Sequence, residues 1–260
     1  MTLIFAHRGA SRRCPENTMI AFKTAHKLGA HGIELDVQLS KDGIPVVIHD
    51  HYLKRTTNGT GYIKDKTFSE LKKLDAGSWF SKTYKNETIP SLEELCEWSN
   101  STDLLLNIEL KNQDITYEGL EEKVITLIHR YQLEKRVILS SFNHNSLLTV
   151  NNIDAHIKTA PIYKANLYEP WNYAKNLKAK GAHPHYKTLT KEKIANFHKH
   201  RISVRPYTVN NEKVMRTFIQ WKVDALITDL PSLGLSVLKE VKDNIQPVKK
   251  HPLWKKLFKR

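Results

Sequence analysis

The stretch that decides the fold is GIELDVQLSKDGIPVVIHD, residues 32–50. In its first half, apolar side chains at positions 33, 35 and 37 alternate with Glu34 and Asp36, which is the period of a β-strand. The second apolar run, IPVVIHD at 44–50, follows a link of only four residues, SKDG. Because so short a link cannot contain a crossover helix, it predicts a hairpin whose second run is antiparallel to the first.

Outside this hairpin, the chain repeats short apolar runs separated by helical patterns. The predicted parallel strands are the eight runs LIFAH (3–7), GIELDVQL (32–39), LLLNIEL (104–110), RVILS (136–140), HIKTAPI (156–162), AHP (182–184), ISVRPY (202–207) and DALIT (224–228). A helix is predicted over 18–28, with Asn17 or Thr18 as N-cap and Gly29 as its stop. Eight parallel strands alternating with helices predict an α/β fold of the (β/α)₈ TIM-barrel class. An open doubly wound sheet is the alternative.

The length of the chain is typical of one large domain, which we place at residues 1–238. Residues 51–103 are too many for a simple connection between strands, and they contain turn signals, aromatic residues and the helix-like PSLEELCEWS. We therefore expect a small insertion within 51–103, after the second strand and its hairpin. It should lie over one mouth of the barrel, where loops carry function.

Acidic residues mark the inner face of two predicted strands. Glu34 and Asp36 share one face of the 32–39 strand, and LLLNIELK repeats the arrangement with Glu109 and Lys111. Three carboxylates converging near the carboxyl ends of barrel strands need a counter-charge, and a hard cation, Mg²⁺ or Ca²⁺, accepts oxygen ligands. The alternative is that these acids form structural ion pairs with Lys or Arg.

Two histidines leave predicted strands at the same end as the acids. His7 follows the first strand and His49 follows the hairpin strand, so they could serve as a general acid and a general base near neutral pH. Arg8 has the planar fork that suits phosphate oxygens, and Gly9 permits a tight turn. For His7 and Arg8 taken singly, the favoured alternatives are a capped strand end and a solvated charge, respectively.

Eight short motifs follow one another along the chain: HRG (7–9), PENT (15–18), ELD (34–36), HD (49–50), ELK (109–111), SSF (140–142), YTVN (207–210) and TDLP (228–231). In this order and approximate spacing, the chain resembles the glycerophosphodiester phosphodiesterases. The resemblance covers about residues 3–238. It implies a (β/α)₈ barrel that uses a divalent metal to hydrolyse glycerophosphodiesters to glycerol 3-phosphate and an alcohol.

The resemblance also implies roles for individual residues. The implied metal ligands are Glu34, Asp36 and Glu109, the implied general acid and base are His7 and His49 in either order, and the implied phosphate-binding residues are Arg8 and Lys111. The family usually has Trp where this chain has Tyr207, which would still give an aromatic wall to the substrate. The nucleophile stays open between metal-activated water and the 2-hydroxyl of the substrate.

Two other functions remain as alternatives. The same site could cleave the headgroup of a lysophospholipid at a membrane surface, as a lysophospholipase D. A non-catalytic phosphate-binding or nucleic-acid-binding protein is the third hypothesis. We disfavour it because every acid and histidine of the expected site is present, and because the chain lacks a zinc finger, a helix-turn-helix signal and aromatics interleaved with a basic stripe.

The net charge of +14 is partly concentrated at the carboxyl end. Residues 239–260 form a basic tail, and within it HPLWKKLFKR (251–260) has the amphipathic pattern of an anchor for an anionic membrane. A terminal helix docked on the barrel is the alternative. We expect a cytoplasmic protein, because the N-terminus lacks a signal-peptide pattern and Cys14 and Cys96 form no disulfide or metal motif.

Overall fold

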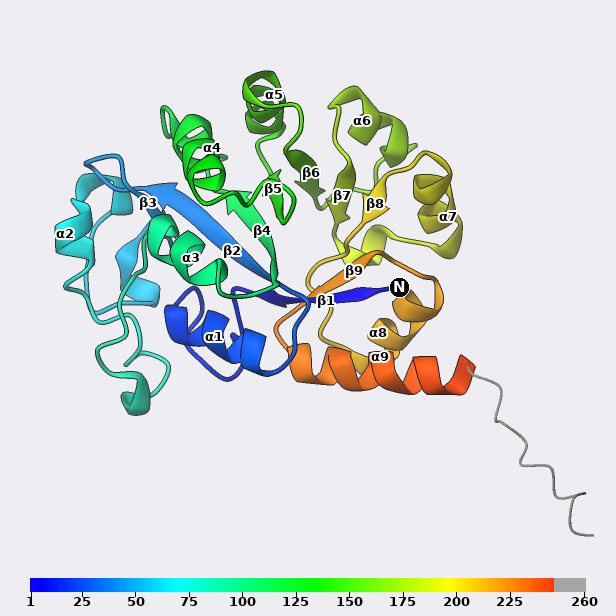
Figure 1. Ribbon diagram of the computed structural model, residues 1–260, viewed down its shortest axis with the longest axis horizontal. Helices are drawn as coiled ribbons and strands as arrows, with labels where there is room; N and C mark the ends of the chain where they lie inside the picture. Colours follow the sequence, from blue (N-terminus) through cyan, green and yellow to red (C-terminus); the bar gives the residue numbers. More distant parts are fainter. Residues whose placement is uncertain (246–260) are drawn as a thin grey trace, which may run out of the picture.

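The computed structural model describes residues 1–245, which form one sheet and the helices around it (Figure 1). The strands are β1 (Leu3–His7), β2 (Gly32–Leu39), β3 (Pro45–Val47), β4 (Leu105–Leu110), β5 (Val137–Ser141), β6 (Lys158–Tyr163), β7 (Gly181–Pro184), β8 (Ser203–Val204) and β9 (Ala225–Thr228). The α-helices are α1 (Met19–Lys27), α2 (Phe68–Leu71), α3 (Leu92–Ser99), α4 (Leu120–Arg130), α5 (His144–Ile153), α6 (Pro170–Asn176), α7 (Lys191–Lys199), α8 (Glu212–Gln220) and α9 (Pro231–Ile245).

Eight of the strands are parallel and nearly close into a barrel. Their order is β8-β7-β6-β5-β4-β2-β1-β9, and β3 pairs with β2 outside this path, antiparallel as predicted. Between the two ends of the order, Asp224 N donates to Val204 O at 3.0 Å and Ile227 N donates to Pro206 O at 3.1 Å. These bonds join the β8 and β9 segments, so the predicted TIM barrel is confirmed and the open sheet is wrong.

The alternation of β2 determines which side chains enter the barrel. Ile33, Leu35 and Val37 are fully buried in the largest core cluster, together with residues of α1, α3 and α4. The opposite face of β2 consequently points inward, which directs Glu34 and Asp36 into the interior. A smaller apolar cluster that includes Phe5 and Ile138 packs beneath them.

The first turn brings β1 and α1 close together. As predicted, Thr18 caps α1, and its side chain accepts from Ala21 N, while Gly29 with φ +84° follows the helix. Gly9 has φ +79°, and a Cβ there would lie 2.7 Å from the carbonyl carbon of Ala21. Only glycine combines this backbone with so close an approach, so Gly9 sets how near α1 lies to the end of β1.

The predicted insertion is present after β3, but it is shorter than residues 51–103. The segment up to Pro90 contains three 3₁₀ turns (Leu53–Arg55, Ile63–Asp65 and Lys82–Tyr84) and α2. It has its own small core, which includes Leu53, Ile63 and Leu71. By contrast, Leu92 and Leu95 of α3 belong to the main core, so α3 is the barrel helix that connects to β4. Figure 1 shows the insertion, in cyan, beyond the end of β2.

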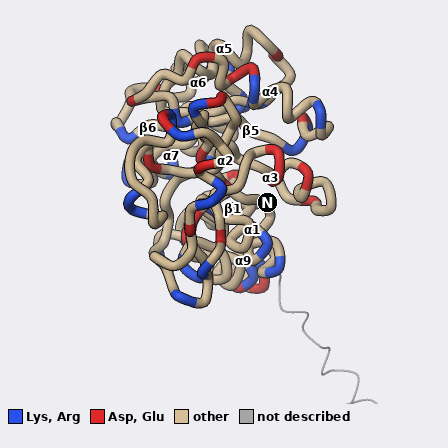
Figure 2. The backbone as a smooth tube through the Cα atoms, turned by 90° about the vertical axis from the view of Figure 1, so that its left-hand side faces the viewer, with Lys and Arg blue, Asp and Glu red and all other residues tan. Residues whose placement is uncertain are grey.

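The last described helix, α9, continues past the predicted domain boundary at residue 238 to Ile245. The anchor predicted for 251–260 lies outside the described residues. Within residues 1–245, no helix combines the length and the apolar character that crossing a bilayer requires. In the view of Figure 2, basic and acidic segments both occur over several elements.

Candidate active site

Three buried carboxylates meet inside the barrel at the carboxyl ends of β2 and β4. The register pairs Asp36 with Glu109 and Glu34 with Asn107, so the inward positions of the two strands are neighbours. One carboxylate oxygen of each of Glu34, Asp36 and Glu109 lies within 4.8 Å of the others. The three residues are at most 8% exposed. The predicted convergence of these three acids is therefore what the structure shows.

This carboxylate cluster holds more negative charge than its surroundings favour. Burial, and then repulsion from Asp36, raises the pKa of Glu34 to about 8 and raises the pKa of Glu109 as well. Burial would also raise the pKa of Asp36, but Arg8 and other nearby cations hold it well below its usual value. The cluster thus retains one strongly ionised carboxylate and two that bind protons readily, which is the condition that a divalent cation would relieve.

Two cationic side chains lie against the cluster. Lys111 Nζ contacts Glu109 Oε1 at 2.8 Å and Asp36 Oδ1 at 3.7 Å. Arg8 contacts Asp36 Oδ2 through Nε at 3.4 Å and donates from Nη1 to Glu16 Oε1 at 2.7 Å. The acids therefore do form ion pairs with Lys and Arg, as the alternative to a metal site expects. However, two cations do not balance the charge of three buried carboxylates.

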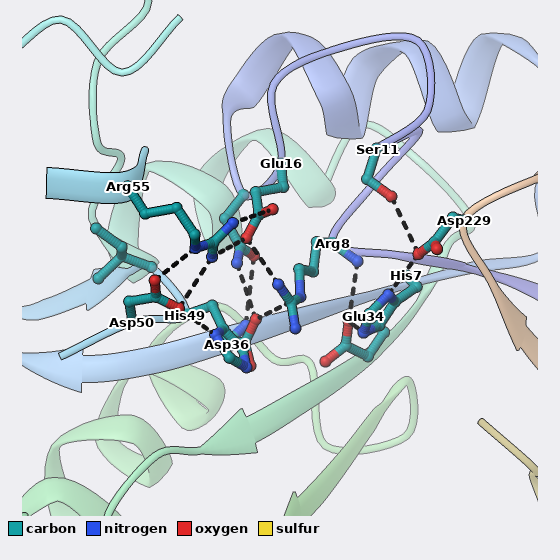
Figure 3. Close-up of polar contacts among 12 residues, drawn as sticks. His7, Arg8, Ser11, Glu16, Glu34, Asp36, His49, Asp50, Arg55 and Asp229 are labelled. Atoms are coloured by element: carbon teal, nitrogen blue, oxygen red, sulfur yellow. Dashed lines mark hydrogen bonds and ion pairs between the residues drawn. The ribbon is translucent and has the colours of Figure 1, made fainter. Parts of the chain in front are cut away.

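Two imidazoles flank the cluster, each bonded to a carboxylate (Figure 3). His7 Nδ1 lies 2.6 Å from Asp229 Oδ1, and His7 Nε2 lies 3.9 Å from Glu34 Oε2. His49 Nδ1 lies 2.6 Å from Asp50 Oδ1, and Figure 3 shows this ring beside Asp36. Burial lowers the pKa of His7, but Glu34 and Asp229 outweigh it, so that the pKa is raised.

Backbone and amide groups hold this arrangement in place. Arg8 N donates to Glu34 Oε2 at 2.9 Å, and Asn17 Nδ2 donates to Asp36 Oδ2 at 2.8 Å. Gln38 is fully buried, and its Nε2 lies 2.9–3.0 Å from three successive carbonyl oxygens of residues 48–50. Because Gln38 follows the two acids on the inner face of β2, one strand fixes both the cluster and the segment that carries His49.

A small cavity lies beside the cluster, and it encloses about 240 Å³ when the part open to solvent is counted. Its lining residues are His7, Glu34, Asn107, Glu109, Ile162, His183, Tyr207 and Ile227. Tyr207 is the aromatic wall of this cavity, and its hydroxyl donates to Tyr163 O at 3.2 Å. Among the described residues, His183 has no partner for either ring nitrogen, and burial followed by Arg205 lowers its pKa well below 6.5.

Comparison with known proteins identifies the family. The model of the glycerophosphoryl diester phosphodiesterase family matches residues 7–233. The chain belongs to this family. It is 45% identical over 239 residues to a glycerophosphodiester phosphodiesterase of Caldanaerobacter subterraneus, covering 92% of this chain and 98% of that one. A phosphodiesterase of Oleispira antarctica, solved in complex with the product sn-glycerol-3-phosphate, matches with a TM-score of 0.83 and 33% identity over 92% of this chain and 97% of that one.

A further relative from Bacillus altitudinis, also a glycerophosphodiester phosphodiesterase, is 44% identical over 93% of this chain and 100% of its own length. The family resemblance and the enzyme class read from the sequence, phosphoric diester hydrolase, are confirmed. The chain has the fold and the buried acidic triad of a phosphodiesterase of this family.

Sequence reasoning missed the carboxylates that hold the histidines. Asp229 and Asp50 lie in the TDLP and HD motifs, but the sequence analysis gave them no role. Asp50 could have been found, because it directly follows His49. Asp229 is 222 residues from His7 in sequence, and only the pairing of β1 with β9 brings the two together.

Proposed function

We propose that this chain hydrolyses glycerophosphodiesters to sn-glycerol 3-phosphate and an alcohol, with Mg²⁺ or Ca²⁺ as a required cofactor. The observation that carries the proposal is one buried carboxylate triad flanked by two imidazoles, each bonded to its own carboxylate. Support also comes from the relatives named as glycerophosphodiester phosphodiesterases and from the relative solved with sn-glycerol-3-phosphate. We assign the activity to the domain at residues 1–238, with the insertion within 51–103 at its mouth.

Glu34, Asp36 and Glu109 would hold the metal. Their buried oxygens form the all-carboxylate donor set that hard divalent cations prefer, and the pKa of Glu34, raised by burial and by repulsion from Asp36, supports this assignment. When bound, the ion would supply Lewis-acid stabilisation of the negative charge that grows on the phosphoryl oxygens during the reaction.

Arg8 and Lys111 would bind the non-bridging oxygens of the phosphate. Both side chains already lie against the cluster. The Nε of Arg8 is buried, and although it lies 3.4 Å from Asp36 Oδ2, it forms no hydrogen bond within the described part of the chain. A phosphate oxygen would supply the acceptor that this donor lacks. Such charge-assisted bonds strengthen as the phosphoryl group gains charge.

His7 and His49 would move the protons. Asp229 and Asp50 are acceptors of the Nδ1 protons, because the pKa of each carboxyl is lowered and each is therefore ionised near neutral pH. Each imidazole then has Nε2 free for the substrate. One histidine would take a proton from the nucleophile, either water or the substrate 2-hydroxyl, and the other would give a proton to the leaving alkoxide.

Replacing His49 tests the proposed chemistry. His49→Ala should lower kcat for glycerophosphocholine by roughly 10²–10⁴, the usual contribution of general acid–base catalysis. His156→Ala is the matched control, because the His156 side chain is 95% exposed and lies in the connection between α5 and β6. Near-wild-type turnover by His49→Ala would contradict the assignment.

Removing the metal tests the cofactor. Chelator-treated protein should lose hydrolysis of the same substrate, and added Mg²⁺ or Ca²⁺ should restore it, whereas Glu109→Gln should bind either ion more weakly in calorimetry. Full activity of the chelated protein would contradict the metal role of the triad. Assay of a lysophospholipid beside glycerophosphocholine separates the proposed function from a lysophospholipase D.

A further inference from the structure

A second pocket shares His7 with the small cavity, and the proposed chemistry places no part of the substrate in it. It encloses about 840 Å³, including the part open to solvent. Its lining residues are His7, Arg8, Ser11, Arg12, Glu16, Trp79, Phe80 and Asp229. They come from the turn between β1 and α1, from the insertion and from the end of β9. Figure 3 shows Ser11, Glu16 and Asp229 around His7 and Arg8.

The small cavity and the open pocket would each take one of the two ester groups of a phosphodiester. His7 lines both of them, and the small cavity of about 240 Å³ is the one that contains Glu34 and Glu109. A phosphorus atom held between His7 and the cluster would extend one ester group into each space. The glycerol that all substrates share would lie on the side of Glu34 and Glu109, and the open pocket has room for an alcohol of variable size.

The acids of the open pocket already have hydrogen-bond partners, whereas one of its cations has no carboxylate partner among the described residues. Glu16 accepts from Arg8 and from Arg55, and Asp229 accepts from His7 and from Asn210. Arg12 is exposed, and it forms no ion pair with any carboxylate in the described part of the chain. A guanidinium without a carboxylate partner at the wall of a substrate pocket favours an anion there.

The opposite wall of the pocket is aromatic and held in place. Trp79 is 40% exposed, donates from Nε1 to Ala76 O at 2.9 Å and packs edge to face on Phe80 at 5.7 Å between centroids. Phe80 packs on Tyr84, whose hydroxyl donates to Arg13 O at 2.7 Å. Tyr84 therefore fixes the aromatic wall relative to the segment that carries Arg12.

We propose that the open pocket binds the leaving alcohol, and that Arg12 makes it selective for alcohols that carry a phosphate or carboxylate group. The proposal rests on the proposed hydrolysis of glycerophosphodiesters. The carbon chain of the alcohol would lie against Trp79 and Phe80, and its anionic group would reach Arg12. A quaternary ammonium is disfavoured in spite of the aromatic wall, because the guanidinium of Arg12 repels it.

The test compares three substrates that share the glycerophosphoryl group: glycerophosphoglycerol phosphate, glycerophosphoglycerol and glycerophosphocholine. Their leaving alcohols are anionic, neutral and cationic. Relative to wild type, Arg12→Gln should lower the ratio of kcat/KM for the anionic over the neutral substrate by about fivefold, the upper range for an exposed charge pair. The ratio for the cationic over the neutral substrate should rise.

Arg13→Gln is the matched control. It removes the same charge at the next position, where the side chain is also exposed but does not line the pocket. It should leave both ratios within about 1.5-fold of wild type, since screening weakens an exposed charge that makes no contact. Unchanged ratios in Arg12→Gln, or equal changes in both variants, would overturn the subsite while leaving the hydrolysis proposal intact. If wild type with metal cleaves none of the three substrates, the proposed function itself fails, and the subsite fails with it.

Discussion

Each histidine of the site has one ring nitrogen committed to a carboxylate, which fixes both the tautomer and the direction of the ring. Asp229 is itself held by Asn210, whose Nδ2 donates to its Oδ2 at 2.6 Å. These hydrogen bonds, from Asn210 through Asp229 to His7, direct the free Nε2 of His7 toward Glu34. The carboxylates therefore position the histidines, although neither carboxylate needs to touch the substrate.

Replacing Asp229 should separate positioning from proton transfer. Asp229→Asn should lower kcat by at least about tenfold, because it forfeits part of the roughly 10²–10⁴ that an oriented acid or base contributes. It should also move the limb of the pH–rate profile that reports His7 to lower pH, because Asp229 raises the pKa of His7. The measurement is kcat/KM against pH for glycerophosphocholine.

Asp154→Asn is the matched control for this variant, because Asp154 bonds His129 Nε2 at 2.9 Å in another part of the molecule. It should leave both the rate and the profile unchanged. A purely structural role for Asp229 would lower the rate without moving the limb of the profile, and that result would contradict the positioning role.

The carboxylate of Glu34 should destabilise the metal-free protein at high pH, although it would serve as a ligand when the metal is bound. The metal-free folded chain raises the pKa of Glu34 from 4.5 to about 8, so it binds a proton that the unfolded chain has released. Its stability should therefore fall as pH rises from about 5 to about 8. Because Glu34→Gln has no carboxylate to ionise there, its free energy of unfolding should fall less.

Urea unfolding in the presence of a chelator, at about pH 5 and about pH 8, measures this difference. Saturating Mg²⁺ or Ca²⁺ should raise the free energy of unfolding of wild type at about pH 8 by more than that of Glu34→Gln, because the variant has lost a metal ligand. If, without metal, the free energy of unfolding of Glu34→Gln fell as much as that of wild type between the two pH values, the raised pKa of Glu34 would be contradicted.

At the scale of elements, the turn between β1 and α1 connects backbone geometry to the site. Gly9 lies in this turn and Gly29 lies just after α1, with φ values of +79° and +84°, respectively. A Cβ at Gly9 meets Ala21, whereas a Cβ at Gly29 has nothing within 4 Å. The two glycines therefore share a backbone requirement but differ in packing.

Alanine at each glycine measures these effects separately. Gly29→Ala should destabilise by about 1 kcal/mol through the left-handed backbone alone. Gly9→Ala should cost about 1–3 kcal/mol more, because α1 must move away from the turn. Thermal and urea unfolding give the comparison. Gly9→Ala should also lower activity, because Arg8 N donates to Glu34 from the same turn. Equal costs for the two variants would contradict the packing argument.

At the scale of the whole molecule, barrel closure brings distant segments to one mouth. β1 lies between β2 and β9, so His7 has the acids of β2 on one side and Asp229 on the other. The insertion adds Trp79 and Phe80 from beyond the end of β2. No single segment of the chain therefore contains the site.

The basic segment at 251–260 predicts binding to anionic membranes. Each basic residue near such a surface contributes about 1 kcal/mol. The full chain should therefore co-sediment with vesicles containing phosphatidylserine at least about tenfold more strongly than a chain that ends at residue 245. Neutral vesicles serve as the control. Equal binding of the two chains would remove the anchor hypothesis.

The fold was predictable because its signals are local. The strand of 32–39, the four-residue link after it and the run at 44–50 are visible in nineteen consecutive letters, and β2 and β3 form where these predict. The extent of the insertion was not predictable in the same way. Whether PSLEELCEWS belongs to the insertion or to the barrel depends on what covers Leu92 and Leu95, and sequence spacing does not contain that information.

By itself, the sequence determined that Glu34 and Asp36 share one face of their strand and that Glu109 shares a face with Asn107, because the side-chain period of a strand is two and does not depend on distant contacts. It also determined the residue types, and with them the preference for a hard cation. Only the tertiary structure decided that Asp229 holds His7 and that Arg12 lines a pocket with Trp79. These pairs are far apart along the chain, and the closed barrel and the folded insertion are the structures that bring them together.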